Sequence, residues 1–466
     1  MALDANSLTA LQTELPNLRL LTAESQLAAY DCDALSYKHF RPDAVAIPAS
    51  AKELVSLVKV LDQLRLPWVV RGAGTSLSGG PVAVQGGVVV HLSQLKAILE
   101  IDVENQYAVV ESGAVLANIA AAVKAKGLYY PPDASSGSVC TIGGNVACNS
   151  GGVHCFRYGV TSDYILGLEV VLPNGQVQQF GGPAGGRGNW KEDWKRLFVG
   201  SEGTLGVFTR FWLKLIPPPE KVWTFRAMFP DIATVSEAIT KLSPDASYPS
   251  AIELMDPRTV DMVENSPMAV GIPSGSFMLL AEIDGPPSLV DTRVEGIEQC
   301  LKQAGATEVL VASDEQERQK LWRARKVQGG LLGQASPDFI VQDAVIPKAA
   351  LADVLQYIYQ QADQLGLPAA TVMHAGDGNL HPNFLFNSAR EGDIEKVELL
   401  GKKLMQKVSE VGGTLSGEHG LGNDKAAYFE AHCGEVSYAM QQVVPRLTNS
   451  AHQLNPQKVM PERVFQ

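Results

Sequence analysis

The first part of the chain alternates short apolar runs with one amphipathic segment. Residues 44–48 and 67–70 are apolar runs of strand length, and Ser50-Ala51-Lys52-Glu53 between them is a capping box that opens a helix. The apolar residues of that helix recur on one side, at Leu54, Leu57, Val58, Val60 and Leu61. Strand, helix and strand within about 30 residues predict a βαβ unit.

The pattern continues with more short strands and few helices. We predict a helical lead-in over residues 1–43, an alanine-rich helix over 115–126, and a long irregular loop over 130–159, where Gly, Ser and Asn dominate. Pro173-Asn174-Gly175 is a strong hairpin signal between two of the strands. The further strands are expected at residues 87–92, 108–111, 167–172, 176–180 and 207–215.

A proline run separates two halves of the chain. Ile216-Pro217-Pro218-Pro219-Glu220 interrupts both strand and helix, which predicts a domain boundary. Beyond it, the predicted strands cover residues 277–283, 339–345 and 369–373, and the predicted helices cover 232–242, 290–304, 348–365 and 394–411. This alternation predicts an α+β domain in which helices back antiparallel strands, followed by an extended tail over 455–461.

Composition narrows the class of protein. With 466 residues, 45% hydrophobic and 19% charged, the chain is globular and has room for about three domains or subdomains. Its net charge of −12, without a basic block, argues against a nucleic-acid partner. The six cysteines show no CxxC spacing and no iron–sulfur pattern, which indicates free thiols in a reducing compartment.

The sequence shows no targeting or membrane segment. The N-terminus lacks a basic start followed by an apolar core, and no stretch reaches the roughly 18 uncharged apolar residues that a membrane span needs. We therefore expect a cytoplasmic protein, which a partner could hold at a membrane.

Three glycine-rich loops in the first half can form backbone cradles. The first, residues 71–80, follows a predicted strand, and its glycines allow several N–H groups to point inward, as a pyrophosphate requires. The second covers residues 131–152 and the third residues 200–206. Neither the GxGxxG spacing of a Rossmann site nor the spacing of a P-loop is present. Together the loops could wrap one large, flat ligand that carries a diphosphate.

As a set, these loops resemble the FAD domain of the vanillyl-alcohol-oxidase/PCMH-type flavoproteins. The resemblance covers residues 40–216 and rests on RGAGTSLSGG, PPDASSGSVCTIGGNVACNSGG, RYG and GSEGTLG. It implies FAD, with the first loop at the pyrophosphate and TIGG and GSEGTLG beside the ribityl chain and the ring. Relatives with covalent flavin often carry a histidine at the position of Thr75, so we expect non-covalent FAD. The implied FAD-binding residues are Arg71, Gly72, Ala73, Gly74, Thr75, Ser76, Leu77, Ser78, Gly79, Pro132, Asp133, Ser136, Gly137, Thr141, Gly143, Gly144, Asn145, Asn149, Gly152, Tyr158, Gly159, Glu202, Gly206, Val207 and Asn455.

Histidines and carboxylates gather in two motifs of the second half. His374 and His381 flank a Gly-Asp-Gly-Asn turn, and Glu418 and His419 stand together further on. Strand residues seven apart would lie on opposite faces, but the turn can fold both imidazoles toward one point. Two imidazoles and the Glu418 carboxylate make a plausible three-ligand set for a divalent metal, zinc or manganese. From these residues alone, a metal-dependent hydrolase is also possible.

The second half resembles one branch of the same family, the 2-hydroxy-acid dehydrogenases. HAGDGNLHPNFLF, SGEHGLG and NPQKVMP carry this resemblance, and residues 336–355 resemble the glycolate dehydrogenase subunit (the flavin subunit of glycolate oxidase) most. The branch also contains D-lactate and D-2-hydroxyglutarate dehydrogenases. The resemblance implies that His374, His381 and Glu418 bind the metal and that His419 is the catalytic base. It further implies that Arg325 pairs with the substrate carboxylate and that Asn383 lies near the substrate.

Two departures from the hydroxyglutarate branch bear on the substrate. That branch carries a lysine at the position of Val341, where it reads a distal carboxylate, and a threonine at the position of Gly329. The apolar side chain of Val341 would leave the second carboxylate of a hydroxyglutarate substrate unpaired, which would weaken its binding. Both departures favour a small monocarboxylate.

The sequence therefore predicts an α+β flavoenzyme in which a PCMH-type FAD-binding domain precedes an α+β substrate domain. We expect a helical lead-in (1–43), the FAD-binding domain (44–216), a substrate or cap domain (217–412), and a C-terminal segment (413–466) that completes the active site and returns to the FAD domain. The expected reaction oxidises glycolate or D-lactate to the 2-oxo acid by hydride transfer to flavin N5, with a metal and a histidine base. The expected acceptor is a quinone, a cytochrome or an iron–sulfur partner subunit. D-2-Hydroxyglutarate dehydrogenase is the alternative.

Overall fold

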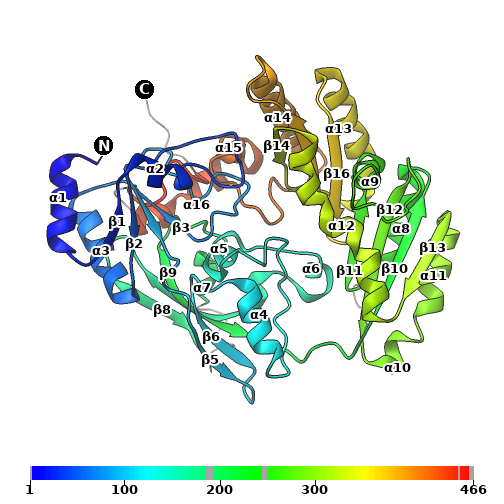
Figure 1. Ribbon diagram of the computed structural model, residues 1–466, viewed down its shortest axis with the longest axis horizontal. Coiled ribbons are helices and arrows are strands. Elements are labelled where there is room, and N and C mark those ends of the chain that lie inside the picture. Colours follow the sequence, from blue (N-terminus) through cyan, green and yellow to red (C-terminus); the bar gives the residue numbers. More distant parts are fainter. Residues whose placement is uncertain (1–2, 184–192, 244–248, 450–451, 461–466) are drawn as a thin grey trace. The chain divides into compact units, whose positions relative to one another are not determined.

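The computed structural model describes residues 3–183, 193–243, 249–449 and 452–460 (Figure 1). It divides into two compact units. The first comprises Met1–Gly151, Val160–Pro218 and Glu418–Gln466, and the second comprises Gly152–Gly159 and Pro219–Gly417. Each unit is built around its own sheets, so each is described separately.

A four-stranded sheet opens the first unit and contains the predicted βαβ crossover. Its strand order is β1 (Arg19–Leu21), β2 (Ala44–Ile47), β4 (Val88–His91) and β3 (Trp68–Arg71). Strands β2 and β3 each pair in parallel with β4, and helix α3 (Ala51–Gln63) leads from β2 to β3, which confirms the βαβ unit. The Ser50 hydroxyl caps α3 by accepting from the Glu53 N–H at 3.2 Å. The predicted helical lead-in contains α1 (Ala5–Glu14), β1, α2 (Glu24–Leu27) and the 3₁₀ turn η1 (Ala28–Tyr30).

The second sheet of this unit has five antiparallel strands. Its order is β5 (Ile98–Asp102), β6 (Tyr107–Glu111), β9 (Val207–Lys214), β7 (Ile165–Val171) and β8 (Val177–Gly181). The β7–β8 hairpin confirms the predicted turn, where the Gly175 N–H donates to the Leu172 carbonyl at 2.8 Å. Helix α4 (Leu116–Lys124) follows β6, and the short helix α7 (Lys195–Phe198) precedes β9. Edge strand β5 has no counterpart in the sequence-based prediction.

The segment predicted as an irregular loop, residues 130–159, contains two short helices, so that prediction was wrong there. These are α5 (Ile142–Cys148) and α6 (Cys155–Tyr158), and a 3₁₀ turn η2 (Thr161–Tyr164) follows. Thr141 caps α5 by accepting from the Gly144 N–H at 3.4 Å, and left-handed Asn149 ends the helix. Two glycines in its first turn weaken the helical signal, although tertiary packing maintains the helix.

An eight-stranded sheet forms the centre of the second unit. Its order is β13 (Glu308–Ala312), β10 (Lys221–Phe229), β12 (Phe277–Gly285), β11 (Ala251–Met255), β16 (Ala369–His374), β17 (Asn379–Phe386) and β14 (Asp338–Val341), and β15 (Ala344–Val345) also pairs with β17. Each of these pairings is antiparallel, as predicted. The predicted strand 339–345 is in fact two strands. The chain leaves the sheet at Asp343, whose carboxylate accepts from the Gly417 N–H at 2.9 Å.

Helices alternate with the strands of this sheet along the chain (Figure 1). They are α8 (Ile232–Leu242), α9 (Pro257–Glu264), α10 (Pro287–Val290), α11 (Val294–Gln303), α12 (Glu315–Ala335), η4 (Lys348–Ala350), α13 (Leu351–Leu365) and α14 (Asp393–Glu410). The predicted helix 290–304 is interrupted, because α10 and α11 are separate. Leu321 and Trp322 of α12 belong to a buried cluster with Met228 of β10 and Leu280 of β12, so packing against the sheet holds α12.

The C-terminal residues belong to the first unit. Helices α15 (Ala426–Cys433), α16 (Glu435–Gln441) and α17 (Val443–Thr448) precede an irregular tail. Leu454 in that tail forms an isolated parallel bridge with Trp68, and the end of the predicted extended tail, Pro461, lies outside the described residues. Within the described part of the chain, no helix combines the length and apolar character that crossing a bilayer demands.

Candidate functional site

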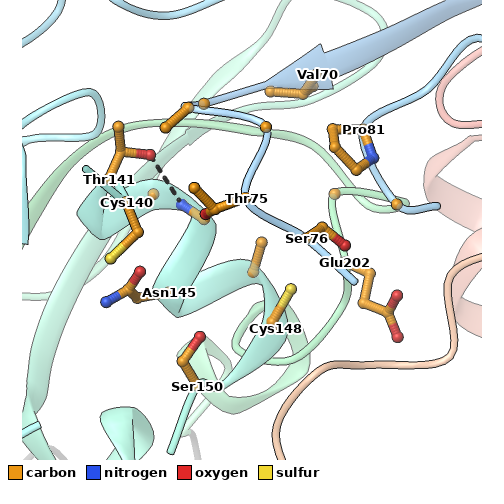
Figure 2. Close-up of a pocket in the computed structure, with 18 of the residues that line it drawn as sticks. Val70, Thr75, Ser76, Pro81, Cys140, Thr141, Asn145, Cys148, Ser150 and Glu202 are labelled. Atoms are coloured by element: carbon orange, nitrogen blue, oxygen red, sulfur yellow. Dashed lines mark hydrogen bonds between the residues drawn. The ribbon is translucent and has the colours of Figure 1, made fainter. Parts of the chain in front are cut away.

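A large cavity lies in the first unit, with an empty volume of about 1270 Å³ that is partly open to solvent. Figure 2 shows Thr75 and Ser76 of the first glycine loop, Thr141 and Asn145 of the α5 region, and Glu202 around this space. Many of the predicted cofactor residues line it, namely Gly72, Ala73, Gly74, Thr75, Ser76, Leu77, Ser136, Thr141, Gly143, Gly144, Asn145, Glu202, Gly206 and Asn455. The three glycine loops therefore meet at one cavity, as the sequence predicted.

Other predicted cofactor residues do not line the cavity. Ser78 and Gly79 continue the first loop, and the others are Arg71, Pro132, Asp133, Gly137, Asn149, Gly152, Tyr158, Gly159 and Val207. The Arg71 guanidinium is buried and donates to the Cys32 carbonyl at 2.9 Å, so in this structure it supports the loop. The prediction also missed Val70, Pro81 and Phe208, which line the cavity. Val70 and Pro81 directly flank the first glycine loop and Phe208 follows the third by two residues, so their position beside these loops is the signal that could have found them.

Two buried charged residues, Lys458 and Asp33, form hydrogen bonds with the backbone of the first glycine loop and the residues just after it. The Lys458 ammonium donates to the carbonyls of Gly79, Gly80 and Val82 at 2.8, 2.8 and 2.6 Å, which uses all three of its hydrogens. The Asp33 carboxylate accepts from the Gly79 N–H at 2.9 Å. Burial lowers the pKa of Lys458 to about 7, against the opposing effect of nearby carboxylates, and burial raises the pKa of Asp33. The loop is therefore positioned by residues far away in the sequence.

The turn that carries His419 is tied to two of the glycine loops. The two carboxylate oxygens of Glu202 accept from the N–H groups of Leu421 and Gly422 at 2.7 and 2.8 Å. The Ser78 hydroxyl donates to the His419 carbonyl at 3.0 Å. Burial raises the pKa of Glu202, while these N–H groups oppose that rise. His419 and Glu418 both line the cavity, so the third loop and the first loop together fix the predicted base at its edge.

In the second unit, the β16–β17 hairpin brings the two predicted metal-binding histidines together. His374 ends β16, Asn379 opposite it opens β17, and the rings of His374 and His381 lie edge to face with centroids 5.1 Å apart. Their side chains are 4% and 5% exposed. This confirms the predicted action of the Gly-Asp-Gly-Asn turn on the two imidazoles.

A buried carboxylate connects one of these histidines with Arg325. Glu253 accepts from Arg325 Nε at 2.9 Å through one oxygen, and its other oxygen lies 2.6 Å from His374 Nδ1. Arg325 is on α12, yet its side chain is only 11% exposed, so it is not a solvated surface charge. Glu253 was not predicted as a site residue, because no sequence motif surrounds it.

Asn383 and Asp343 lie beside the second histidine. The Asn383 amide donates to the carbonyls of Ala370 and His381 at 3.0 and 3.1 Å, which uses both of its N–H groups. An Asp343 carboxylate oxygen lies 3.8 Å from His381 Nδ1. The role of Asn383 toward a substrate stays a prediction. Its amide N–H groups are both used within the sheet, so only its side-chain oxygen could contact a substrate.

The chemistry of the two histidines fits a transition metal. In each, an acceptor oxygen lies on the Nδ1 side: the Glu253 carboxylate at 2.6 Å for His374 and the Gln342 carbonyl at 3.4 Å for His381, with the Asp343 carboxylate further off at 3.8 Å. Such partners favour a hydrogen on Nδ1 and leave Nε2 as the ligand atom, an arrangement common around metal-binding histidines. Two buried imidazole nitrogens suit zinc, and manganese would require an oxygen ligand beside them, such as the carboxylate of the predicted set.

Residues 152–159 belong to the second unit, although they lie in the first half of the sequence. Arg157 forms an ion pair with Asp284 at 2.8 Å, and the Tyr158 hydroxyl donates to the same carboxylate at 2.9 Å. His154 Nε2 lies 3.1 Å from a carboxylate oxygen of Glu282. The predicted roles of Gly152, Tyr158 and Gly159 toward FAD stay predictions.

Comparisons with known proteins agree with this organisation. A family of FAD binding domains matches residues 42–181, and a family described as FAD linked oxidases, C-terminal domain, matches residues 218–459. Two solved structures share the fold: 4-ethylphenol oxidase from Gulosibacter chungangensis in an isoeugenol complex (TM-score 0.81, 19% identity, 99% of each chain) and p-cresol methylhydroxylase with substrate bound (TM-score 0.80, 15% identity, 98% of this chain and 96% of that one). The predicted PCMH-type α+β fold is therefore confirmed.

Curated relatives cover almost the whole chain. The glycolate oxidase subunit GlcD of Escherichia coli (strain K12) is 36% identical over 455 residues, covering 97% of this chain and 91% of the relative. That of Bacillus subtilis (strain 168) is 36% identical over 431 residues, covering 92% of this chain and 91% of the relative. The D-lactate dehydrogenase of Anaerostipes hadrus is 31% identical, covering 91% of this chain and 90% of the relative. The cavity, the loops around it and these matches lead to one conclusion: the chain belongs to the FAD-linked oxidases and is an FAD-linked oxidoreductase.

Proposed function

We propose that this protein is an FAD-dependent dehydrogenase that oxidises a small 2-hydroxy acid, glycolate or D-lactate, to glyoxylate or pyruvate. The observation that carries the proposal is the buried group of Arg325, Glu253, His374 and His381. The buried Glu253 carboxylate holds a guanidinium and the His374 imidazole, and the His381 ring packs against that of His374. A guanidinium beside imidazoles is suited to an acid with a neighbouring hydroxyl. Relatives named glycolate oxidase subunit and D-lactate dehydrogenase support the same substrate class.

The proposal gives each residue a chemical task. Arg325 binds the substrate carboxylate through paired, charge-assisted hydrogen bonds. His419 accepts the proton of the α-hydroxyl, since a neutral imidazole has a nitrogen lone pair that can take it up. FAD, when bound, would supply the two-electron acceptor for the α-hydrogen, which leaves the α-carbon as a hydride with both electrons of the C–H bond. His374, His381 and Glu418 would hold a divalent metal, zinc or manganese, which makes the hydroxyl proton more acidic.

The residues at positions 341 and 329 favour a small monocarboxylate over D-2-hydroxyglutarate. Val341 of β14 stands opposite Asn383 of β17 in the sheet and offers no charge to a second carboxylate. A side chain at Gly329 of α12 would meet open space, so the glycine leaves room without supplying a donor. Glycolate and D-lactate differ by one methyl group, which a pocket distinguishes by only about 1–3 kcal/mol. We therefore propose activity on both acids.

The reduced cofactor must pass its electrons on. We propose a quinone, a cytochrome or an iron–sulfur partner subunit as the acceptor, and two of the relatives are themselves named as subunits. Thr75 lines the cavity where relatives with covalent flavin carry a histidine, so the FAD is proposed to be non-covalent.

An anaerobic absorbance experiment tests this function. The purified protein is expected to be yellow and to lose its blue absorbance when mixed without oxygen with glycolate or D-lactate. D-2-Hydroxyglutarate at the same concentration should bleach it at least tenfold more slowly. A His419→Ala variant should keep its yellow colour and bleach far more slowly than the wild type, because it retains the cofactor but lacks the base.

Three results would contradict the proposal or a part of it. A yellow protein that neither acid bleaches would exclude the substrate class. Faster bleaching by D-2-hydroxyglutarate than by the smaller acids would show that the interpretation of Val341 is wrong. Loss of colour in the His419→Ala variant would mean that this side chain supports the fold.

A further inference from the structure

Glu253 lies at the centre of the proposed substrate-binding group, yet it stands outside the sequence motifs on which the family resemblance rests. It is on β11, directly opposite His374 in the antiparallel pairing with β16, and is 1% exposed. One of its carboxylate oxygens accepts from Arg325 Nε at 2.9 Å, and the other lies 2.6 Å from His374 Nδ1. A single carboxylate therefore touches two residues that have different proposed tasks.

The charges in this group decide which ring nitrogen of His374 carries the hydrogen. A carboxylate at this depth is costly unless a cation compensates it, and the Arg325 guanidinium does so. An ionised carboxylate can only accept hydrogen bonds, so the 2.6 Å contact requires a hydrogen on His374 Nδ1. A neutral imidazole with a hydrogen on Nδ1 has its lone pair on Nε2, the form that a metal ligand needs.

The same contact fixes the plane of Arg325. A guanidinium is planar and presents its N–H groups as a rigid fork, so holding Nε also sets the direction of the two terminal nitrogens. Because Glu253 occupies Nε, a substrate carboxylate would meet the terminal nitrogens. Lysine cannot reproduce this arrangement, because it has one nitrogen and no plane.

We propose that Glu253 is a positioning residue that serves both tasks at once: it sets the tautomer of His374 for the metal and the orientation of Arg325 for the substrate carboxylate. The inference rests on the proposed function and adds a residue to it. A purely structural role explains less, since the β11–β16 pairing is made by the backbone and an apolar residue would suit a buried strand position.

Glu253→Gln tests the proposal, because glutamine keeps the size but loses the charge and one acceptor. Metal-stripped protein that retains its FAD is titrated with Mn²⁺ alone, and free Mn²⁺ is followed by electron paramagnetic resonance. The variant is expected to bind Mn²⁺ about 10–100-fold more weakly. Its KM for glycolate should rise at least tenfold, with an unchanged content of FAD per chain.

Two further variants separate the tasks. Arg325→Lys should raise the KM by a similar factor and leave Mn²⁺ affinity within about threefold, since His374 keeps its carboxylate. Glu282→Gln removes another buried carboxylate of the same sheet that also pairs with an arginine, Arg318, at 3.1 Å. It should change neither Mn²⁺ affinity nor KM by more than about threefold, which controls for a general loss of packing.

The outcomes distinguish this inference from the proposed function. Unchanged Mn²⁺ affinity and unchanged KM in the Glu253→Gln variant would overturn the inference while the bleaching by glycolate stood. Equal losses in the Glu253→Gln and Glu282→Gln variants would also overturn it, because general damage would then explain them. If the wild type binds no Mn²⁺ yet is bleached, the metal half of the inference fails.

Discussion

At the scale of single residues, Glu282 of β12 shows how a fully buried charge is kept in this fold. Its carboxylate accepts from the Thr224 hydroxyl and the Trp322 indole N–H, both at 2.5 Å, and pairs with Arg318 and His154, both at 3.1 Å. Burial alone would raise the pKa of Glu282, but the hydrogen bond and charge of His154 and the charge of Arg318 outweigh it and lower the pKa to about 2.

This lowered pKa predicts how stability depends on pH. Because the carboxyl binds its proton less readily when folded, its contribution is complete above about pH 4.5 and is lost as pH falls toward 2. Glu282→Gln should therefore lower the free energy of unfolding by about 3 kcal/mol at pH 7, and by progressively less as pH falls below 4.5. Urea unfolding at pH 7, 4 and 3 measures this.

A neighbouring ion pair provides the control. Glu308 on β13 pairs with Arg226 at 3.4 Å but is 43% exposed, so Glu308→Gln should change stability by less than about 1 kcal/mol at every pH. A loss for Glu282→Gln that stayed constant from pH 7 to pH 3 would show that packing, and not charge, stabilises this position.

At the scale of elements, helix α5 and the first glycine loop must approach closely. A Cβ added to Gly72 would lie 2.3 Å from Thr141 Oγ1, the atom that caps α5, so the loop and the helix leave no room for a side chain there. Gly72→Ala should displace the cap and reduce FAD retention at least tenfold. FAD per chain after gel filtration measures this.

A second substitution tests the cause. Thr141→Ala removes the clashing oxygen, at the cost of the cap, about 1 kcal/mol. In the double variant of Gly72 and Thr141, FAD retention should recover in part, which a double-mutant cycle detects. Gly296→Ala in α11 is the control, because a Cβ there meets open space. Full FAD retention in Gly72→Ala would contradict the clash.

The elements that could be predicted from the sequence are those whose signals are local. Helix α3 and the β7–β8 hairpin carry strong local signals, an amphipathic face and a Pro-Asn-Gly turn, and both form as predicted. Helix α5 was missed because two glycines in its first turn suggested a loop, although Gly143 is there to let the helix approach Ser112, whose carbonyl oxygen a Cβ would meet at 2.7 Å. The site divides likewise: His374 and His381 stand in a motif, but Glu253, Asp33 and the contacts of Lys458 depend on partners distant in the sequence, which no local pattern reveals.

At the scale of the whole molecule, the chain passes between its two units after residues 151, 159, 218 and 417. The first unit is therefore completed only by the C-terminal tail. Leu454 is 1% exposed in its core, and Trp68 of β3 exchanges backbone hydrogen bonds with Gln453 and Asn455, both at 2.8 Å. Lys458 then holds the first glycine loop.

A chain that ends at residue 449 should consequently fail to retain FAD, although it keeps every glycine loop and both histidine motifs. It loses the burial of Leu454, about 1.5–3 kcal/mol, together with the edge contacts of β3 and the Lys458 contacts. A chain that ends at residue 460 keeps all of these and should stay yellow.

If the shorter chain is insoluble, the Lys458→Met variant of the full-length protein tests the loop contacts alone. We expect it to lose FAD while its helix content stays unchanged. Stoichiometric FAD in the chain that ends at 449 would show that the tail is dispensable for the cavity.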